Sequence, residues 1–128
     1  MKIIMVKGNS DSHKTTTINL VYFQLLQLGA TVIAPRTQVG GQLFDFECIL
    51  EYNDKKIAFF SMGDDYAPVA AALQKYNQLG CDWLIMANSN KRYIPGEVLR
   101  YDPSPVIIDK YKPEEIDLQD KDKIISHL

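Results

Sequence analysis

The sequence predicts an α/β domain whose central sheet is mostly parallel and carries an antiparallel hairpin at one edge. Short apolar runs that suit buried strands alternate with segments whose apolar residues recur every three or four positions. Residues 44–61 instead alternate with a period of two around Asn53-Asp54, which favours a hairpin. We expect three layers, about five strands and a single domain over residues 1–128, a length that can bury a core without metals or disulfides.

The first quarter of the chain predicts a strand, a helix and a second strand. Residues 3–6 are an apolar run that suits the first strand. Residues 14–28 follow with helical spacing of the apolar side chains Ile18, Val21, Tyr22, Leu25 and Leu28. Gly29 is the expected stop of this helix. Residues 31–34 suit a short strand, and we expect a loop from Pro35 to Gln42.

The hairpin is predicted to pair one half-exposed strand with one buried strand. On the first strand, one face is expected to hold Phe44, Phe46, Cys48, Leu50 and Tyr52. The opposite, polar face is expected to hold Asp45, Glu47 and Glu51. Asn53 and Asp54 tolerate the left-handed conformation that a tight turn requires, and residues 56–60 return as an apolar strand.

The second half of the chain continues with helices and buried strands. The break at Gly63-Asp64-Asp65 precedes a second helix that is marked by Val69, Leu73, Tyr76 and Leu79 and ended by Gly80. The remaining predicted elements are strands at 83–87 and 105–108, a helical turn at 97–100 and a last helix within 113–128.

Composition and charge exclude several functional classes. The chain is 46% hydrophobic and 23% charged, with a formal net charge of −2, as in a soluble globular protein. It has no basic block that would indicate a nucleic-acid partner, and no apolar run approaches the length of a membrane span. The N-terminal residues suit a strand rather than a signal peptide, so we expect a cytoplasmic protein with Cys48 and Cys81 buried as reduced thiols. The sequence does not indicate the oligomeric state.

The segment from Gly8 to Thr15 nearly matches a phosphate-binding loop. The pattern G-x-x-x-x-G-K-[ST] is met at Gly8, Lys14 and Thr15, whereas His13 stands at the second glycine. The loop lies between a predicted strand and a predicted helix, where loop N–H groups and the helix N-terminus together form an anion site. Histidine is among the residues that adopt positive φ more readily, so we expect His13 to do so at a cost of about 1–3 kcal/mol.

This loop, the hairpin that follows the first helix and the segment Phe59 to Asp65 make the chain resemble the P-loop nucleoside triphosphatase superfamily, as a small member with a variant loop. The hairpin is similar to that of the small GTPases within the superfamily. The resemblance implies that Lys14 reaches the β- and γ-phosphates of ATP or GTP as the catalytic lysine and that Thr15 binds Mg²⁺. It implies nucleotide binding along the whole loop, by Gly8, Asn9, Ser10, Asp11, Ser12, His13, Lys14, Thr15 and Thr16.

The resemblance also implies a second metal-binding segment, and here the chain departs from the family. The superfamily has an apolar strand that ends in aspartate, but this strand ends at Ser61, with Asp64 three residues later. Asp64 could reach the metal through water, which makes it a candidate ligand. Alternatively, Asp64 or Asp65 caps the second helix.

A polar segment after the strand at 83–87 is a further candidate. Lys91 and Arg92 follow the carboxyl end of a central strand, where open α/β sheets bind ligands, and they could lie over the phosphates. The alternative is an exposed polar loop. Asn90-Lys91 does not complete the guanine-selecting signature, because Tyr93 takes the place of its aspartate. The base therefore stays open between adenine and guanine.

Three functions follow from these residues. The first is an enzyme that uses ATP or GTP and Mg²⁺ as a phosphotransferase, such as a small-molecule kinase, or as an NTPase. The second is a non-catalytic module that binds a nucleotide or another phosphorylated small molecule. The third is a flavodoxin-like FMN-binding protein, because Ser10, Ser12 and Thr15 match the spacing of its hydroxyl-rich phosphate loop. The predicted hairpin argues against the third, since flavodoxin-like domains alternate strands and helices in a parallel sheet.

Overall fold

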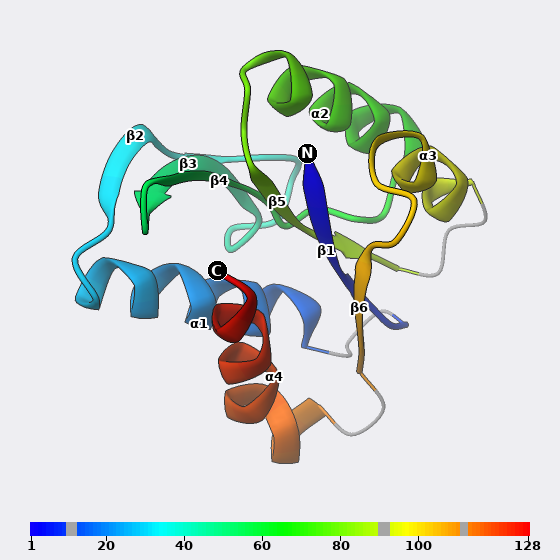
Figure 1. Ribbon diagram of the computed structural model, residues 1–128. Coiled ribbons are helices and arrows are strands. Elements are labelled where there is room, and N and C mark those ends of the chain that lie inside the picture. Colours follow the sequence, from blue (N-terminus) through cyan, green and yellow to red (C-terminus); the bar gives the residue numbers. More distant parts are fainter. Residues whose placement is uncertain (10–12, 90–92, 111–112) are drawn as a thin grey trace.

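A computed structural model describes residues 1–9, 13–89, 93–110 and 113–128. These residues form a six-stranded sheet with helices on both of its faces (Figure 1). In chain order the elements are β1 (Lys2–Lys7), α1 (Lys14–Gln27), β2 (Thr31–Gln38), β3 (Phe46–Tyr52), β4 (Lys55–Phe60), α2 (Tyr66–Gln78), β5 (Trp83–Asn88), α3 (Ile94–Tyr101), β6 (Val106–Asp109) and α4 (Pro113–His127).

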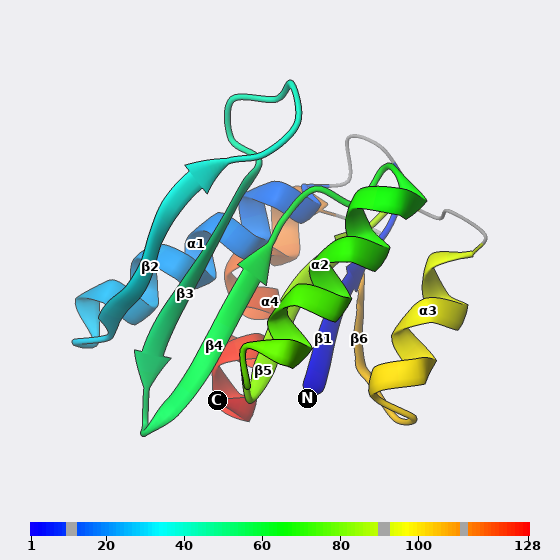
Figure 2. The ribbon, with the colours of Figure 1, turned by 90° about the horizontal axis from the view of Figure 1, so that it is seen from above.

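The strand order across the sheet is β2-β3-β4-β5-β1-β6, which Figure 2 shows from above. Strands β4, β5, β1 and β6 are parallel to one another, and β3 runs antiparallel to both of its neighbours. The predicted α/β class, the mostly parallel sheet and the hairpin are confirmed. The predicted strand number of about five is too low, because the described residues contain six strands.

Strand β2 is longer than predicted and changes the place of the hairpin. The expected loop from Pro35 to Gln42 is wrong at its start, because the strand continues through Pro35 to Gln38. β2 lies at the sheet edge and pairs with β3 with register shifts between Val32 and Ala34 and between Ala34 and Thr37. An edge strand tolerates proline because it can leave one side of its backbone unpaired. The hairpin of β3 and β4 therefore lies one strand inside the edge.

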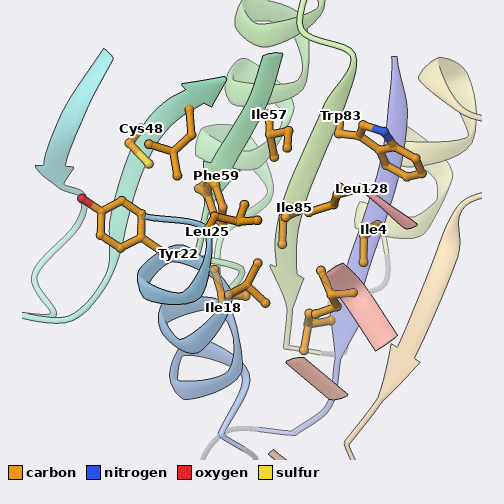
Figure 3. Close-up of a cluster of buried hydrophobic side chains, with 14 of the residues drawn as sticks. Ile4, Ile18, Tyr22, Leu25, Cys48, Ile57, Phe59, Trp83, Ile85 and Leu128 are labelled. Carbon is orange, nitrogen blue, oxygen red and sulfur yellow. The ribbon is translucent and has the colours of Figure 1, made fainter. Parts of the chain in front are cut away.

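Two hydrophobic clusters hold the layers together. On one face, α1 and α4 pack against the sheet; Figure 3 shows Ile18, Tyr22 and Leu25 of α1 pointing toward sheet side chains such as Phe59 and Ile85. On the other face, α2 and α3 cover a second cluster. Both predicted buried thiols, at Cys48 and Cys81, lie in these clusters as free cysteines.

The predicted turn residues adopt the expected conformations. Gly29 has φ 94° directly after the C-cap of α1, and Asn53 and Asp54 have φ 52° and 61° in the β3–β4 turn. The single helical turn expected near Glu97 is instead the eight-residue helix α3. No helix within the described part of the chain has both the length and the apolar character that crossing a bilayer requires.

Candidate functional site

A pocket of about 410 Å³ lies at the carboxyl end of the parallel strands, beside the start of α1. Three segments approach it from the sheet: residues 42–45 before β3, residues 61–64 after β4 and Ser89 after β5. The side chains and backbone that line it belong to His13, Lys14, Thr15, Thr16, Gln42, Phe44, Asp45, Ser61, Gly63, Asp64 and Ser89. The structure therefore brings together four predicted loop residues and the predicted metal ligand Asp64.

His13 adopts the conformation that the loop pattern requires of glycine. It is the N-cap residue of α1, with φ 62° and ψ 29°, which confirms the predicted positive φ. The Thr17 N–H donates to the His13 carbonyl at 3.0 Å, which begins the helix. At the other end of the loop, the Gly8 N–H donates to the Asn88 carbonyl at 3.1 Å and so joins the loop to the end of β5.

Lys14 is the first residue of α1, and its side chain extends back toward the loop. Only 7% of the residue is exposed, and its Nζ donates to the Asn9 carbonyl at 2.6 Å. The first turn of α1 contains no acidic residue, so its positive dipole end is left available for an anion. The ammonium group therefore lies beside the Asn9 carbonyl, close to the N-terminus of α1.

Thr15 donates its hydroxyl hydrogen bond to a buried carboxylate that the sequence pattern did not select. Its Oγ1 lies 3.0 Å from Oδ1 of Asp45, and the Ser61 hydroxyl donates to the same oxygen at 3.1 Å. Ser61 Oγ in turn accepts the Phe46 N–H at 2.9 Å. Asp45 is only 5% exposed, so these hydroxyl groups replace the hydration that its carboxylate has lost.

The position of Asp45 corrects the predicted alternation of the hairpin. Asp45 was expected to face solvent and Phe44 to be buried, but Phe44 is 67% exposed. The strand begins only at Phe46, and the preceding residues form a turn in which Asp45 N–H donates to Gln42 and its carbonyl accepts from Val39. The two-residue period does not apply in that turn. The Asp45 carboxylate therefore lies in the turn before β3 and beside Ser61, which follows β4.

Asp64 lies in the pocket rather than on α2. Ser89, at the end of β5, donates its hydroxyl hydrogen to Asp64 Oδ1 at 2.5 Å. The alternative that Asp64 or Asp65 caps α2 holds in position only: Asp65 is the N-cap residue, but its carboxylate makes no capping hydrogen bond. Asp64 stays a prediction as a metal ligand.

Gly63 lets this segment pass the end of β5. A Cβ atom at Gly63 would lie 2.2 Å from the Ala87 carbonyl oxygen, and the Gly63 carbonyl accepts the Ser89 N–H at 3.1 Å. Because β5 lies between β4 and β1, the residues after β4 must cross its end to approach the loop at the start of α1. The close approach at Gly63 makes this crossing feasible.

Oxygen donors of the kind that Mg²⁺ prefers surround the pocket. Thr15 Oγ1, the Asp45 carboxylate and the Asp64 carboxylate are all in its lining. No three His, Cys, Asp or Glu side chains of the described residues gather into a metal-binding group. This donor set fits Mg²⁺, which is commonly held by one or two carboxylates together with phosphates and water, better than it fits a metal that needs a full protein cage.

Several predicted residues give no structural test. Ser10, Asp11 and Ser12 of the loop, and Lys91 and Arg92 after β5, lie outside the described residues. Thr16 is exposed at the pocket wall. These residues stay predictions from the sequence.

Neither Asn19 nor Asp45 was selected as a site residue from the sequence, although the sequence did indicate where Asp45 lies. Counting outward from the Asn53-Asp54 turn places Phe46 opposite Ser61, so Asp45 had to lie beside the end of the returning strand. Asn19 gave no such signal. Its Nδ2 donates to the Thr15 carbonyl at 2.8 Å and to the Phe44 carbonyl at 3.3 Å, which ties α1 to the turn before β3.

Comparison of the chain with protein-family models, curated proteins and solved structures found no match. A functional interpretation must therefore follow from the geometry of the pocket.

Proposed function

We propose that this chain is a nucleotide-binding protein of the P-loop type, which binds ATP or GTP with Mg²⁺ in the pocket at the start of α1. The observation that carries the proposal is the 3.0 Å hydrogen bond between Thr15 Oγ1 and the buried Asp45 carboxylate, in the pocket that Lys14 also lines. This binding mode needs a lysine, a hydroxyl residue and a carboxylate near the end of a strand; Asp45 lies in the turn before β3 and contacts Ser61 just after the end of β4.

The phosphate groups would be held by Lys14 and the backbone at the start of α1. The Lys14 Nζ already donates to a carbonyl oxygen, that of Asn9, at 2.6 Å. A phosphate oxygen is a stronger acceptor than a carbonyl because it is charged, so exchanging one for the other favours binding. The positive end of the α1 dipole, without acidic residues in its first turn, adds to the attraction.

Thr15, Asp45 and Asp64 would hold Mg²⁺ beside the terminal phosphates. The bound ion would neutralise charge that develops on the phosphoryl oxygens. Asp45 orients the Thr15 hydroxyl, and Ser61 fixes the Asp45 carboxylate from the other side. The departure at Ser61 therefore still leaves a carboxylate at this place, although it comes from the turn before β3.

The same pocket serves an enzyme and a binding module, and these differ only in turnover. An enzyme would hydrolyse the nucleotide or transfer its terminal phosphoryl group to a small molecule. A module would hold the nucleotide, or another phosphorylated ligand, unchanged. Phosphate release in the presence of Mg²⁺ separates the two.

The test is calorimetric titration of the chain with ATP, GTP, pyrophosphate and FMN, each with and without Mg²⁺. We expect Mg²⁺-dependent binding of ATP or GTP and a loss of at least a hundredfold in affinity for Lys14→Ala. Lys123→Ala removes an exposed lysine of α4 and is the matched control, for which we expect unchanged affinity. Unchanged affinity in Lys14→Ala would overturn the proposal. Tight binding of FMN alone would replace it with the flavodoxin-like alternative.

A further inference from the structure

The side chain of His13 contacts the C-terminal helix rather than solvent alone. Its Nδ1 lies 2.9 Å from Oδ2 of Asp117 on α4, a residue 104 positions away in the chain. Oδ1 of Asp117 accepts from Lys110 Nζ at 2.6 Å. Lys110 also donates to Asp120 at 2.8 Å. Four side chains therefore form one connected group between the phosphate loop and α4, which we call the His13–Asp120 group (His13, Lys110, Asp117, Asp120).

Three members of this group are largely buried, and its two carboxylates share one lysine. The Lys110 side chain has no exposed surface and that of Asp120 only 3%, while Asp117 retains 13%. Lys110 offers one positive charge to two carboxylates. Imidazole donates the additional hydrogen bond to Asp117, the more exposed of the two.

The Asp117 carboxylate is the fixed partner in this contact. Burial would raise the pKa of Asp117, but hydrogen bonds from Lys110 and His13 outweigh it and hold the pKa below its usual value. An ionised carboxylate only accepts hydrogen bonds, so His13 carries its proton on Nδ1 when it contacts Asp117. The Lys110 N–H also donates to the Lys7 carbonyl at 3.0 Å, which anchors the group at the end of β1.

We propose that Asp117 is a positioning residue for the phosphate site and acts through His13. The inference rests on the proposed function. Glycine would adopt the backbone conformation of position 13 without cost, whereas histidine needs something to hold it at φ 62°. The bond to Asp117 supplies that constraint, because it fixes the ring on α4. Position 13 is then already in the conformation proposed for binding, which lowers the cost of binding an anion.

Helix α4 thereby belongs to the phosphate site as well as to the core. The competing explanation is that Asp117 only neutralises Lys110 and so stabilises the fold. Asp120 separates these explanations, because it bonds the same lysine from the same helix, whereas the hydrogen bond of His13 goes to Asp117. A purely structural role predicts similar effects for both carboxylates. A positioning role predicts an effect of Asp117 alone, and only while histidine is present.

A double-mutant cycle tests this with His13→Gly, Asp117→Asn and the double variant, with Asp120→Asn as the control. The affinity for Mg²⁺–ATP or Mg²⁺–GTP, whichever the wild-type chain binds more tightly, is measured by calorimetry. Urea unfolding confirms that each variant is folded. We expect Asp117→Asn to weaken binding about tenfold and His13→Gly to bind as tightly as the wild type or more tightly. In the His13→Gly background, Asp117→Asn should change affinity less than twofold, as should Asp120→Asn in the wild type.

The inference would be overturned if Asp117→Asn lowered the nucleotide affinity equally in the wild type and in His13→Gly, or lowered it in neither. If Asp117→Asn does not fold, His13→Ala provides the test, because alanine has neither the bond nor the freedom of glycine. We then expect His13→Ala to bind about fivefold more weakly than His13→Gly, and equal affinities would overturn the inference. A wild-type chain that binds no nucleotide overturns the proposed function together with this inference. A chain that binds nucleotide through Lys14 but gives an additive cycle overturns this inference alone.

Discussion

Replacing Gly63 with alanine tests how the segment after β4 crosses the end of β5. The added Cβ would lie 2.2 Å from the Ala87 carbonyl oxygen, 2.4 Å from its carbonyl carbon and 2.8 Å from the Asn88 nitrogen. All three are backbone atoms of β5, which is hydrogen-bonded to β4 on one side and β1 on the other. No side chain can rotate away to make room, so backbone has to move.

The size of the required movement sets the expected cost. An ordinary contact with a Cβ is about 3.4 Å, so the segment or the strand must shift by roughly 1 Å. Overpacking a rigid interior costs about 1–3 kcal/mol, and a clash with backbone belongs at the upper end. We expect Gly63→Ala to lower the free energy of unfolding by about 3 kcal/mol, which for a chain of this size lowers the Tm by roughly 10 °C.

Urea unfolding followed by circular dichroism measures this cost, and two other glycines are matched controls. An added Cβ at Gly41 or Gly96 meets nothing within 4 Å. Gly96 lies inside α3, where alanine should stabilise by about 0.5–1 kcal/mol. If the free energies of unfolding of the Gly63→Ala and Gly41→Ala variants differ by less than about 0.5 kcal/mol, the crossing geometry is refuted.

Four further outcomes follow from individual contacts. Asp45→Ala should weaken nucleotide binding at least tenfold with Mg²⁺ and much less without it; equal losses in both titrations would contradict a metal-orienting role. Arg36→Met should lower the free energy of unfolding by about 1–2 kcal/mol, because the guanidinium lies 3.8 Å from the Phe46 ring centroid, and an unchanged urea midpoint would contradict this. The lowered pKa of Asp117 means that its contribution to stability is present above its usual pKa and lost as pH falls through its folded pKa. Urea midpoints of the wild type and Asp117→Asn should therefore differ at pH 6 and converge toward pH 3. A difference that stays constant with pH would contradict the lowered pKa of Asp117. Burial raises the pKa of the Cys48 thiol to about 12, so a thiol reagent at pH 8 should modify Cys48 only after unfolding.

The parts of the fold that depend on local patterns could be predicted from the sequence. The spacing of Ile18, Tyr22 and Leu25 indicated α1 because a helix places these side chains on one face. The turn at Asn53-Asp54 was predictable because few residues tolerate positive φ. The course of β2 was not, because an exposed edge strand with register shifts leaves little periodic signal.

The site was predictable only where residue type alone determined the geometry. The positive φ of His13 followed from its place in the loop pattern. Its contact with Asp117 could not follow from any local pattern, because 104 residues separate them and the contact depends on how α4 packs. The orientation of Asp45 was mispredicted for a related reason: alternation is a property of paired strand, and Asp45 lies in the turn before the strand begins.

Under the proposed function, the two departures from the phosphate-loop pattern share one physical explanation. At His13 the missing freedom of glycine is replaced by a hydrogen bond to Asp117, and at Ser61 the missing carboxylate is replaced by that of Asp45. In both cases the compensating group is an aspartate from a distant element. His13→Gly should be tolerated alone, because glycine does not need the bond to Asp117, whereas a change at Ser61 toward the family pattern should be tolerated only together with a change at Asp45. Ser61→Asp alone would place a second carboxylate beside the buried Asp45, where like charges repel strongly, whereas Ser61→Asp with Asp45→Ser should keep Mg²⁺-dependent binding. If the single variant binds as well as the exchanged pair, Asp45 does not occupy the role that Ser61 left open.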